Sequence, residues 1–311
     1  MTTLYLDRRN MALKIRQGTL AVYRDQRQQT TIPLKLLERI IARSDVALSG
    51  SLLAELGSRG IGLTLISGRK GEKVAHVIGH LHNDATRRLA QYRAYHNTQA
   101  RLELARRTVM AKLANQQRFV QALIRQRPDQ RMALTKAQKG IAKIRKELQT
   151  TTNLDTLRGQ EGAAAAAYFS AYQSVLPPRL EFSGRNRRPP KDPVNATLSL
   201  SYTLAHGDAV NAAHLAGLDP AIGMLHDLAW GRPSLASDLI EPLRPYIDKW
   251  VWGLFRDRIL DHEHFSYEGE ACLLKKNGRQ RYYGLWEARA RALRRWLRLT
   301  ARNLVHQIEQ E

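Results

Sequence analysis

Apolar residues recur at helical spacing in the segment RLELARRTVMAKLANQQRFVQALI, residues 101–124. The residues at this spacing are Leu102, Val109, Leu113, Val120 and Leu123. Intervals near multiples of 3.6 predict a long amphipathic helix. Pro128 ends it, because proline removes a helical hydrogen bond. This periodicity begins near Thr86, and helical patterns continue from there to the last residues of the chain.

Outside this segment the chain falls into two parts with different patterns. Further helices are expected at residues 133–148, 157–173, 195–216, 221–226, 234–255 and 285–308. Before residue 86, short strands separated by glycine-containing turns are expected at residues 3–6, 12–15, 19–23, 29–33, 45–48, 61–66 and 74–78. Gln17-Gly18 is expected to form a hairpin turn, and a glycine-containing loop is expected at 68–71. Pro33 is expected to open a short helix through Ile41, and Gly50-Ser51 to cap another over residues 52–56.

The two patterns together predict an α+β fold. A small N-terminal β-sheet or sandwich domain is expected over residues 1–85, and a larger all-α domain over residues 86–311.

Charge indicates the class of partner. The chain has 50 Lys and Arg residues against 28 Asp and Glu residues, a net charge of +22. Residues 83–150 alone contain 16 basic and 4 acidic residues. Such broad basic faces favour a long nucleic-acid duplex over a single phosphate. If about 6 to 10 phosphates are neutralised, affinity falls by orders of magnitude between low and moderate salt.

The expected compartment is the cytoplasm. Cys272 is the single cysteine, so no intrachain disulfide can form. Asp7, Arg8 and Arg9 interrupt the N-terminus, which therefore lacks the apolar core of a signal peptide. No apolar run approaches the roughly 20 residues that span a bilayer, so no membrane partner is expected.

A basic segment, RNRRPPKDPVNA, occupies residues 185–196. Arg185, Arg187, Arg188 and Lys191 place four cations within seven residues, beside two adjacent prolines. A basic loop stiffened by proline suits a polyanion better than a small apolar ligand.

Metal chemistry is suggested by three segments on either side of this loop. Glu161 lies in LRGQEG, and His226 lies in GMLHD. Asp238 and Glu241 lie in SLASDLIE, three residues apart, so they share a face of one helical turn. Two carboxylates and an imidazole can hold Mg²⁺ or Mn²⁺. Taken singly, each has a structural alternative: a carboxylate in the first turn of a helix, a core histidine, and solvated acids.

Pro242, directly after Glu241, predicts a kink or helix end there. The remaining candidates favour structural roles. His76, His80 and His82 cluster in a strand-and-turn setting, without nearby carboxylates or cysteines. DHEH, residues 261–264, falls in an expected loop between helices, and residues 68–73 do not form a nucleotide-binding P-loop.

Order and spacing of the segments add a resemblance. Residues 157–162, 185–202, 217–226 and 232–245 occur in the order LRGQEG, RNRRPPKDPVNATLSLSY, GLDP leading to LH, and RPSLA through RP. In this order they closely resemble the CRISPR-associated integrase family, the larger subunit of the spacer-acquisition complex, over nearly the full length. Met224 stands where an aromatic residue is frequent in that family, and Pro242 where a non-proline residue is frequent.

The resemblance implies a metal-dependent DNA integrase and endonuclease of CRISPR antiviral defence, using Mg²⁺ or Mn²⁺. Its members form homodimers, and pairs of dimers assemble around a small dimeric CRISPR-associated partner subunit. The 3′-hydroxyls of a short double-stranded DNA attack phosphodiesters at the ends of a CRISPR repeat. Carried over, Glu161, His226 and Glu241 are the metal ligands and catalytic residues, with Asp238 a further acid beside them. The residues implied in DNA binding are Arg185, Arg187, Arg188, Arg232, Lys275 and Lys276.

Two alternatives stay open. A non-catalytic basic scaffold would bind DNA in a salt-sensitive way without cutting or joining it. A metal-dependent nuclease for branched repair intermediates would use the same residues and release cut DNA.

Overall fold

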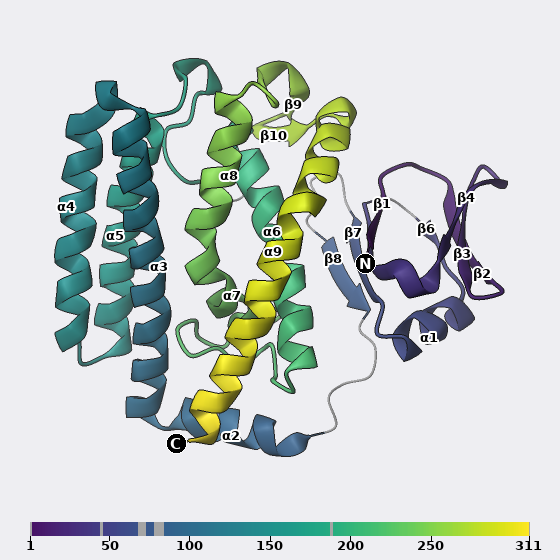
Figure 1. Ribbon diagram of the computed structural model, residues 1–311, viewed down its shortest axis with the longest axis horizontal. Coiled ribbons are helices and arrows are strands. Elements are labelled where there is room, and N and C mark those ends of the chain that lie inside the picture. Colours follow the sequence, from purple (N-terminus) through teal and green to yellow (C-terminus); the bar gives the residue numbers. More distant parts are fainter. Residues whose placement is uncertain (1, 44–45, 68–72, 78–83, 187–188, 311) are drawn as a thin grey trace. The chain divides into compact units, whose positions relative to one another are not determined.

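The structure, a computed structural model, describes residues 2–43, 46–67, 73–77, 84–186 and 189–310. The chain divides into two compact units, Met1–Asn83 and Asp84–Glu311 (Figure 1). The first unit contains most of the strands, and the second is mostly helical. The predicted α+β class is confirmed.

Two four-stranded sheets form the first unit, in the orders β1-β5-β7-β8 and β4-β3-β2-β6. Their strands are β1 (Thr2–Leu6), β2 (Met11–Arg16), β3 (Thr19–Arg24), β4 (Arg27–Pro33), β5 (Leu37–Ala42), β6 (Val46–Ala47), β7 (Gly62–Ser67) and β8 (Lys73–Val77). The predicted hairpin turn between β2 and β3 is confirmed. Gln17 and Gly18 both have positive φ, 46° and 73°. Two such residues make the turn whose twist matches that of paired strands.

The helix predicted after Pro33 is wrong. The chain makes one 3-10 turn, Leu34–Leu36, and then enters β5. This strand runs parallel to both β1 and β7. Ile40, Ile41 and Ala42 are all buried, as expected for a central parallel strand covered on both faces. Periodicity alone does not distinguish a strand from a buried helix in a continuous apolar run of this length.

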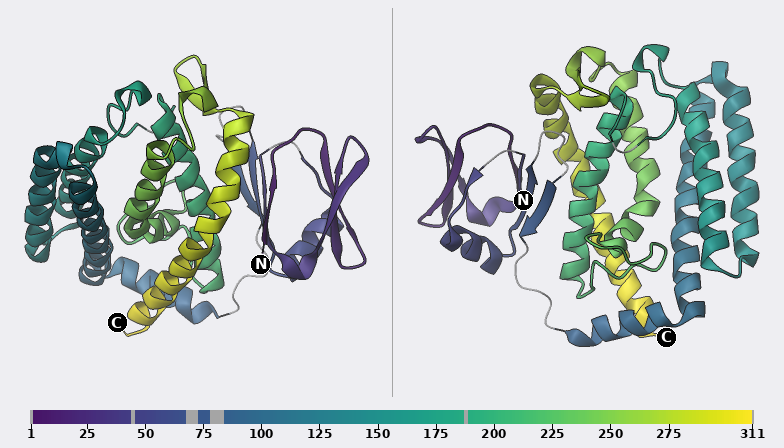
Figure 2. Two further views of the ribbon diagram at one scale, coloured as in Figure 1. Left: turned by 45° about the horizontal axis from the view of Figure 1, so that its top comes forward. Right: turned by 180° about the vertical axis from the view of Figure 1, so that it is seen from behind.

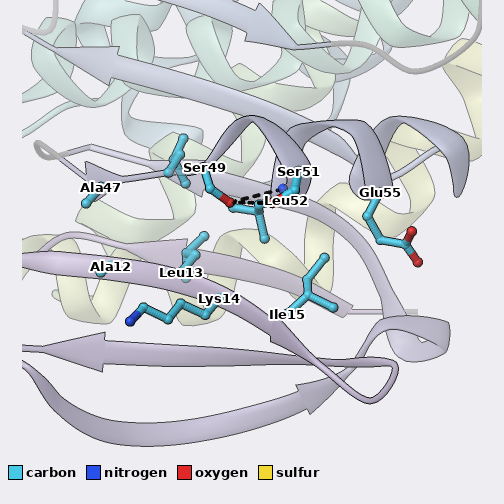
Figure 3. A pocket seen from close by; sticks show the side chains of 10 residues that line it. Ala12, Leu13, Lys14, Ile15, Ala47, Ser49, Ser51, Leu52 and Glu55 are labelled. Atoms are coloured by element: carbon cyan, nitrogen blue, oxygen red, sulfur yellow. Dashed lines mark hydrogen bonds between the residues drawn. The ribbon is translucent and has the colours of Figure 1, made fainter.

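Helix α1 (Gly50–Ser58) completes the first unit. Ser49 is its N-cap, since the Oγ atom accepts a hydrogen bond from the Leu52 amide at 3.2 Å. Figure 3 shows this cap at the edge of a pocket between β2, β6 and α1, with Lys14 and Glu55 also lining it. The predicted loop 68–71, Ile78, His80 and His82 lie outside the described residues.

The second unit contains α2 (Ala85–His96), α3 (Thr98–Gln126), α4 (Arg131–Glu147), α5 (Leu154–Ser174), α6 (Pro193–Leu215), α7 (Ser234–Ile240), α8 (Arg244–Arg256) and α9 (Lys276–Glu309). Helices α3, α4 and α5 lie side by side, whereas α6 packs against α7, α8 and α9 (Figures 1 and 2). The predicted apolar stripe of α3 is confirmed as buried. Pro128 follows the end of α3 as predicted.

Three helical predictions need correction. Residues 221–226 are irregular, because backbone N–H groups in this segment donate to a side chain of α7. A hairpin of β9 (Phe265–Glu268) and β10 (Ala271–Leu274) interrupts the helical unit and buries Cys272. Helix α9 begins at Lys276, nine residues earlier than predicted.

Gly278 explains how α9 starts so close to this hairpin. A Cβ atom there would lie 2.7 Å from the Leu274 side chain and 3.1 Å from the His264 carbonyl oxygen.

Among the described residues, no helix is both long and apolar enough to cross a membrane.

Candidate active site

A buried lysine joins two of the predicted acidic residues. Lys112 lies on α3, Glu161 on α5, and Glu241 directly after α7. The Lys112 ammonium donates to Glu161 Oε1, and it donates to Glu241 Oε2 at 2.5 Å. The structure thus brings Glu161 and Glu241 into contact with one cationic nitrogen.

Sequence reasoning missed Lys112. Its signal was position: Lys112 follows Val109 by three residues and precedes Leu113, so it falls on the predicted apolar face of α3. A lysine on a buried face requires an opposite charge. The pKa of Lys112 is raised, because the attraction of Glu241 and Glu161 outweighs the opposing effect of burial.

Glu241 is ionised despite its burial. Burial by itself raises its pKa, but Arg244 and Lys112 outweigh it and lower the pKa to about 2. Arg244, the first residue of α8, forms an ion pair from its Nε to Glu241 Oε1 at 2.8 Å. The carboxylate therefore carries its charge throughout the physiological pH range.

The backbone at Glu241 confirms the predicted effect of Pro242. Helix α7 ends at Ile240, a 3-10 turn covers Glu241–Leu243, and α8 begins at Arg244. Asn115 Nδ2 donates to the Pro242 carbonyl at 2.7 Å. Lys112 and Asn115, three residues apart on α3, thus hold the side chain and the backbone of this junction.

Asp238 holds His226 and the segment that carries it. Its Oδ2 atom accepts from the Met224 and Leu225 amides, at 2.6 and 2.9 Å. Its Oδ1 atom accepts from the His226 amide at 3.1 Å and contacts His226 Nδ1 at 2.6 Å. With the proton on Nδ1 facing Asp238, the His226 Nε2 lone pair is left for another partner. Asp238 is thus the orienting group of His226.

Gly223 allows this segment to pass close to α7. A Cβ atom on Gly223 would lie 2.8 Å from the Ser234 carbonyl carbon and 2.9 Å from Asp238 Oδ2. Any larger residue therefore pushes against the backbone and against the carboxylate that orients His226.

The carboxylates of Glu161 and Glu241 and the imidazole of His226 are ligand types that a hard divalent cation accepts. In this structure the Lys112 ammonium neutralises the two carboxylates. Among the described residues, no group of three or more His, Cys, Asp or Glu side chains is arranged so that it could hold a metal ion. Glu161 and Glu241 nevertheless face a common cation, and His226 is near enough to contribute to the lowered pKa of Glu241. Oxygen-rich ligands of this kind suit Mg²⁺ or Mn²⁺. An ion between the two glutamates would take the place of the ammonium.

Comparison with known proteins identifies the family. The family model described as CRISPR associated protein Cas1 matches residues 4–288. The chain belongs to the Cas1 family.

The chain is also similar to individual proteins of this family and to solved structures. One is the CRISPR-associated endonuclease Cas1 1 of Thermodesulfovibrio yellowstonii, 33% identical over 294 residues, covering 92% of this chain and 91% of the relative. A solved Cas1 protein from Thermotoga maritima matches with a TM-score of 0.87 at 24% identity, covering 100% of this chain and 98% of that one. A casposase bound to integration product matches with a TM-score of 0.85 at 20% identity, covering 100% and 92%. These structural likenesses show the shared Cas1 fold.

The residues implied in DNA binding take different positions in this Cas1 chain. Arg187 and Arg188 lie outside the described residues. Arg185 donates to Asn195 Oδ1 at 2.7 Å and to Ser199 Oγ at 3.1 Å, so it fixes the basic segment to α6. Of the residues implied in DNA binding, Arg232, Lys275 and Lys276 are exposed to solvent.

Tyr202 connects the basic segment to the site. Its ring lies under two guanidinium groups, at 5.3 Å from Arg185 and 4.5 Å from Arg244. Its hydroxyl donates to Asp248, a buried residue that also accepts from Tyr168 at 2.9 Å. Burial raises the pKa of Asp248 to about 6, against the opposing effect of these hydrogen bonds.

Two histidine-containing clusters show structural contacts. His264 is buried, and its Nδ1 atom accepts from the Asp261 amide at 3.1 Å, completing a capping box. His76 Nδ1 lies 3.2 Å from Thr64 Oγ1 across neighbouring strands. These contacts give His264 and His76 structural partners, whereas His80 and His82 lie outside the described residues.

Proposed function

We propose that this Cas1 family member is a metal-dependent DNA integrase and endonuclease that inserts short duplex DNA into a CRISPR array. The observation that carries the proposal is the convergence of Glu161 and Glu241 on one cation position, with His226 oriented beside them. The net charge of +22 supports a DNA substrate. The endonuclease name of the relatives supports phosphodiester chemistry.

Glu161, His226 and Glu241 are the proposed ligands of Mg²⁺ or Mn²⁺. Such an ion, when bound, supplies positive charge to the target phosphate and to the attacking 3′-oxygen. Arg244 and Lys112 keep Glu241 ionised, so this ligand needs no deprotonation before binding. Asp238 fixes the ring of His226, which leaves Nε2 as the donor.

Lys112 has a part in the same chemistry. A buried carboxylate and a half-buried one repel each other at close range unless a cation lies near both, and here these are Glu241 and Glu161. The Lys112 ammonium contacts both and therefore holds them together in the metal-free protein.

The proposed partners are double-stranded DNA, a second copy of the chain and a Cas2 subunit. The proposed DNA contacts are Arg185, Arg187, Arg188, Arg232, Lys275 and Lys276. Support comes from solved relatives of this fold described as a Cas1–DNA complex, with a TM-score of 0.53, and as a Cas6-RT-Cas1–Cas2 complex, with a TM-score of 0.85. We place the protein in the cytoplasm.

Strand joining tests the proposal. The protein is incubated with and without the Cas2-type partner, a short duplex with 3′-hydroxyl ends and a plasmid carrying a CRISPR repeat. Joined products are expected only with a divalent metal. Glu161→Ala, His226→Ala and Glu241→Ala should abolish joining while duplex binding stays nearly intact.

Glu263→Ala is the matched control, because the Glu263 side chain is 72% exposed and lies outside the site. Full joining by Glu241→Ala would show that the metal assignment is wrong. Cut but unjoined DNA in the presence of the partner would favour the repair nuclease. Binding without cutting or joining in any divalent metal would favour the scaffold.

A further inference from the structure

An exposed turn follows the site histidine directly. The Arg232 amide donates to the Ala229 carbonyl at 3.1 Å, and Gly231 has a φ of +65°. A hydrogen bond of this span with positive φ at the third residue defines a tight β-turn. Trp230 therefore occupies the corner of a turn that begins three residues after His226.

Trp230 is exposed over its whole surface, with a relative exposure of 105%. Leu228, two residues earlier, is 50% exposed. The same chain buries Trp252 and Trp286 almost completely. A fully exposed indole presents a flat apolar face on which another flat ring can stack.

The base of this turn is held firmly. The Asp227 carboxylate accepts from Arg158 at 2.6 Å and from Arg101 at 2.7 Å. The Asp227 carbonyl accepts from Arg232 at 2.6 Å and from Ser234 Oγ at 2.7 Å. Four contacts on Asp227 fix the chain directly after His226, two residues before the turn begins. Trp230 is thus presented at a defined place beside the candidate site.

The site is partly covered. Glu241 is only 4% exposed, whereas the Glu161 and His226 side chains are 24% and 31% exposed, so a single strand reaches Glu241 more easily than a regular duplex does. A strand end that separates from its complement exposes the flat face of its last bases. Aromatic side chains stack on such bases with little dependence on sequence.

We propose that Trp230, with Leu228 beside it, is a stacking platform for an unpaired base of the DNA strand that enters the site. The proposal rests on the proposed function and adds a binding residue to it. Two apolar side chains are too small a patch for a stable protein interface, which buries about 1,200 Å² or more. The basic character of the chain favours nucleic acid as the occupant.

Equilibrium binding in EDTA tests this without any chemical step. The full-length chain is titrated into a blunt duplex and into the same duplex with a splayed 3′ end. The splayed strand carries 2-aminopurine as its last unpaired base, whose fluorescence is quenched by stacking. Trp230→Ala and Trp230→Phe are compared with Trp296→Ala, a matched control because Trp296 is 55% exposed on α9.

Wild-type protein should quench the 2-aminopurine signal and prefer the splayed duplex. Trp230→Ala should lose the quenching and bind splayed DNA about tenfold more weakly. Its affinity for blunt duplex should stay within about twofold, because backbone contacts dominate there. Trp230→Phe should retain the quenching, and Trp296→Ala should resemble the wild type.

Unchanged quenching and unchanged affinity in Trp230→Ala would overturn the proposal. Loss of self-association or of partner binding in light scattering, with DNA binding intact, would overturn it in favour of a protein contact. If the wild type bound neither DNA, the proposed function would fail as well. If joining depended on Glu241 but Trp230→Ala behaved as wild type, the platform alone would fail.

Discussion

Replacing Lys112 with methionine separates the structural role of its ammonium from that of its aliphatic stem. Methionine fills a similar volume, but it leaves Glu161 and Glu241 facing each other without the cation between them. Lys112 is only 7% exposed, so water cannot take its place readily. We therefore expect Lys112→Met to destabilise the metal-free protein.

The size of the loss follows from two estimates. Removing one partner of a buried ion pair costs about 3 to 5 kcal/mol. Independently, the pKa of Glu241 falls from 4.5 to about 2. That shift corresponds to about 3 kcal/mol at neutral pH, shared between Arg244 and Lys112. Lys112 supplies part of that shift, so we take about 3 kcal/mol, the lower end of the ion-pair estimate, which lowers the melting temperature of a unit of this size by roughly 6 to 12 °C.

Divalent metal should reverse part of this loss. In the wild type an incoming ion has to displace the ammonium, whereas in Lys112→Met the two carboxylates have no competing cation. The melting temperature of the variant should therefore rise more on adding Mn²⁺ than that of the wild type. Scanning calorimetry in EDTA and across a Mn²⁺ series measures both effects.

Lys143→Met provides the control for this comparison. The Lys143 side chain is 80% exposed on α4 and lies 3.9 Å from Glu147, so its loss should change stability by less than about 0.5 kcal/mol. Equal melting temperatures of Lys112→Met and the wild type in EDTA would refute the structural role of the ammonium. An equal response to Mn²⁺ would refute the idea that lysine and metal share one place.

Four further outcomes are expected. Gly223→Ala should reduce strand joining at least tenfold by displacing Asp238, whereas Gly253→Ala, where a Cβ meets nothing within 4 Å, should be active in the same assay. The stability that Glu241 contributes is present above about pH 4.5 and is lost as pH falls towards 2, so denaturant melts of wild type and Glu241→Gln should converge in acid. The pH dependence at Asp248 has the opposite sign, because its pKa is raised to about 6 in the folded protein and the stability it contributes is lost as pH rises through 6. In urea melts, the free energy of unfolding of the wild type should therefore fall by about 1 kcal/mol relative to that of Asp248→Asn between pH 5 and 8. A fragment of residues 84–311 should give a cooperative thermal transition in circular dichroism; a broad, non-cooperative signal would show that the division into domains at this point is wrong.

Most of the fold could be predicted from patterns within single helices, strands and turns. The apolar stripe of α3, the strands with their hairpin turn at Gln17-Gly18 and the helix end at Pro242 were all predictable from short stretches of sequence. Each depends on spacing within one element or on the backbone chemistry of one residue. The net charge and the order of the motif segments likewise indicated a DNA enzyme of the CRISPR-associated integrase family.

The remaining features depend on contacts between residues that are distant in the sequence, which local patterns do not predict. Lys112 and Glu241 are 129 residues apart, and only the packing of α3 against the α7–α8 junction brings them together. Residues 221–226 looked helical, but Asp238 takes their amide hydrogen bonds and holds His226 in place. The sequence by itself predicted candidate metal ligands and a nucleic-acid partner, because residue type, spacing and charge are local properties, and the family resemblance added the candidate DNA contacts. Only the tertiary structure decided that one lysine contacts both glutamates and that Trp230 stands exposed in the turn after His226, because burial and charge pairing depend on the whole fold.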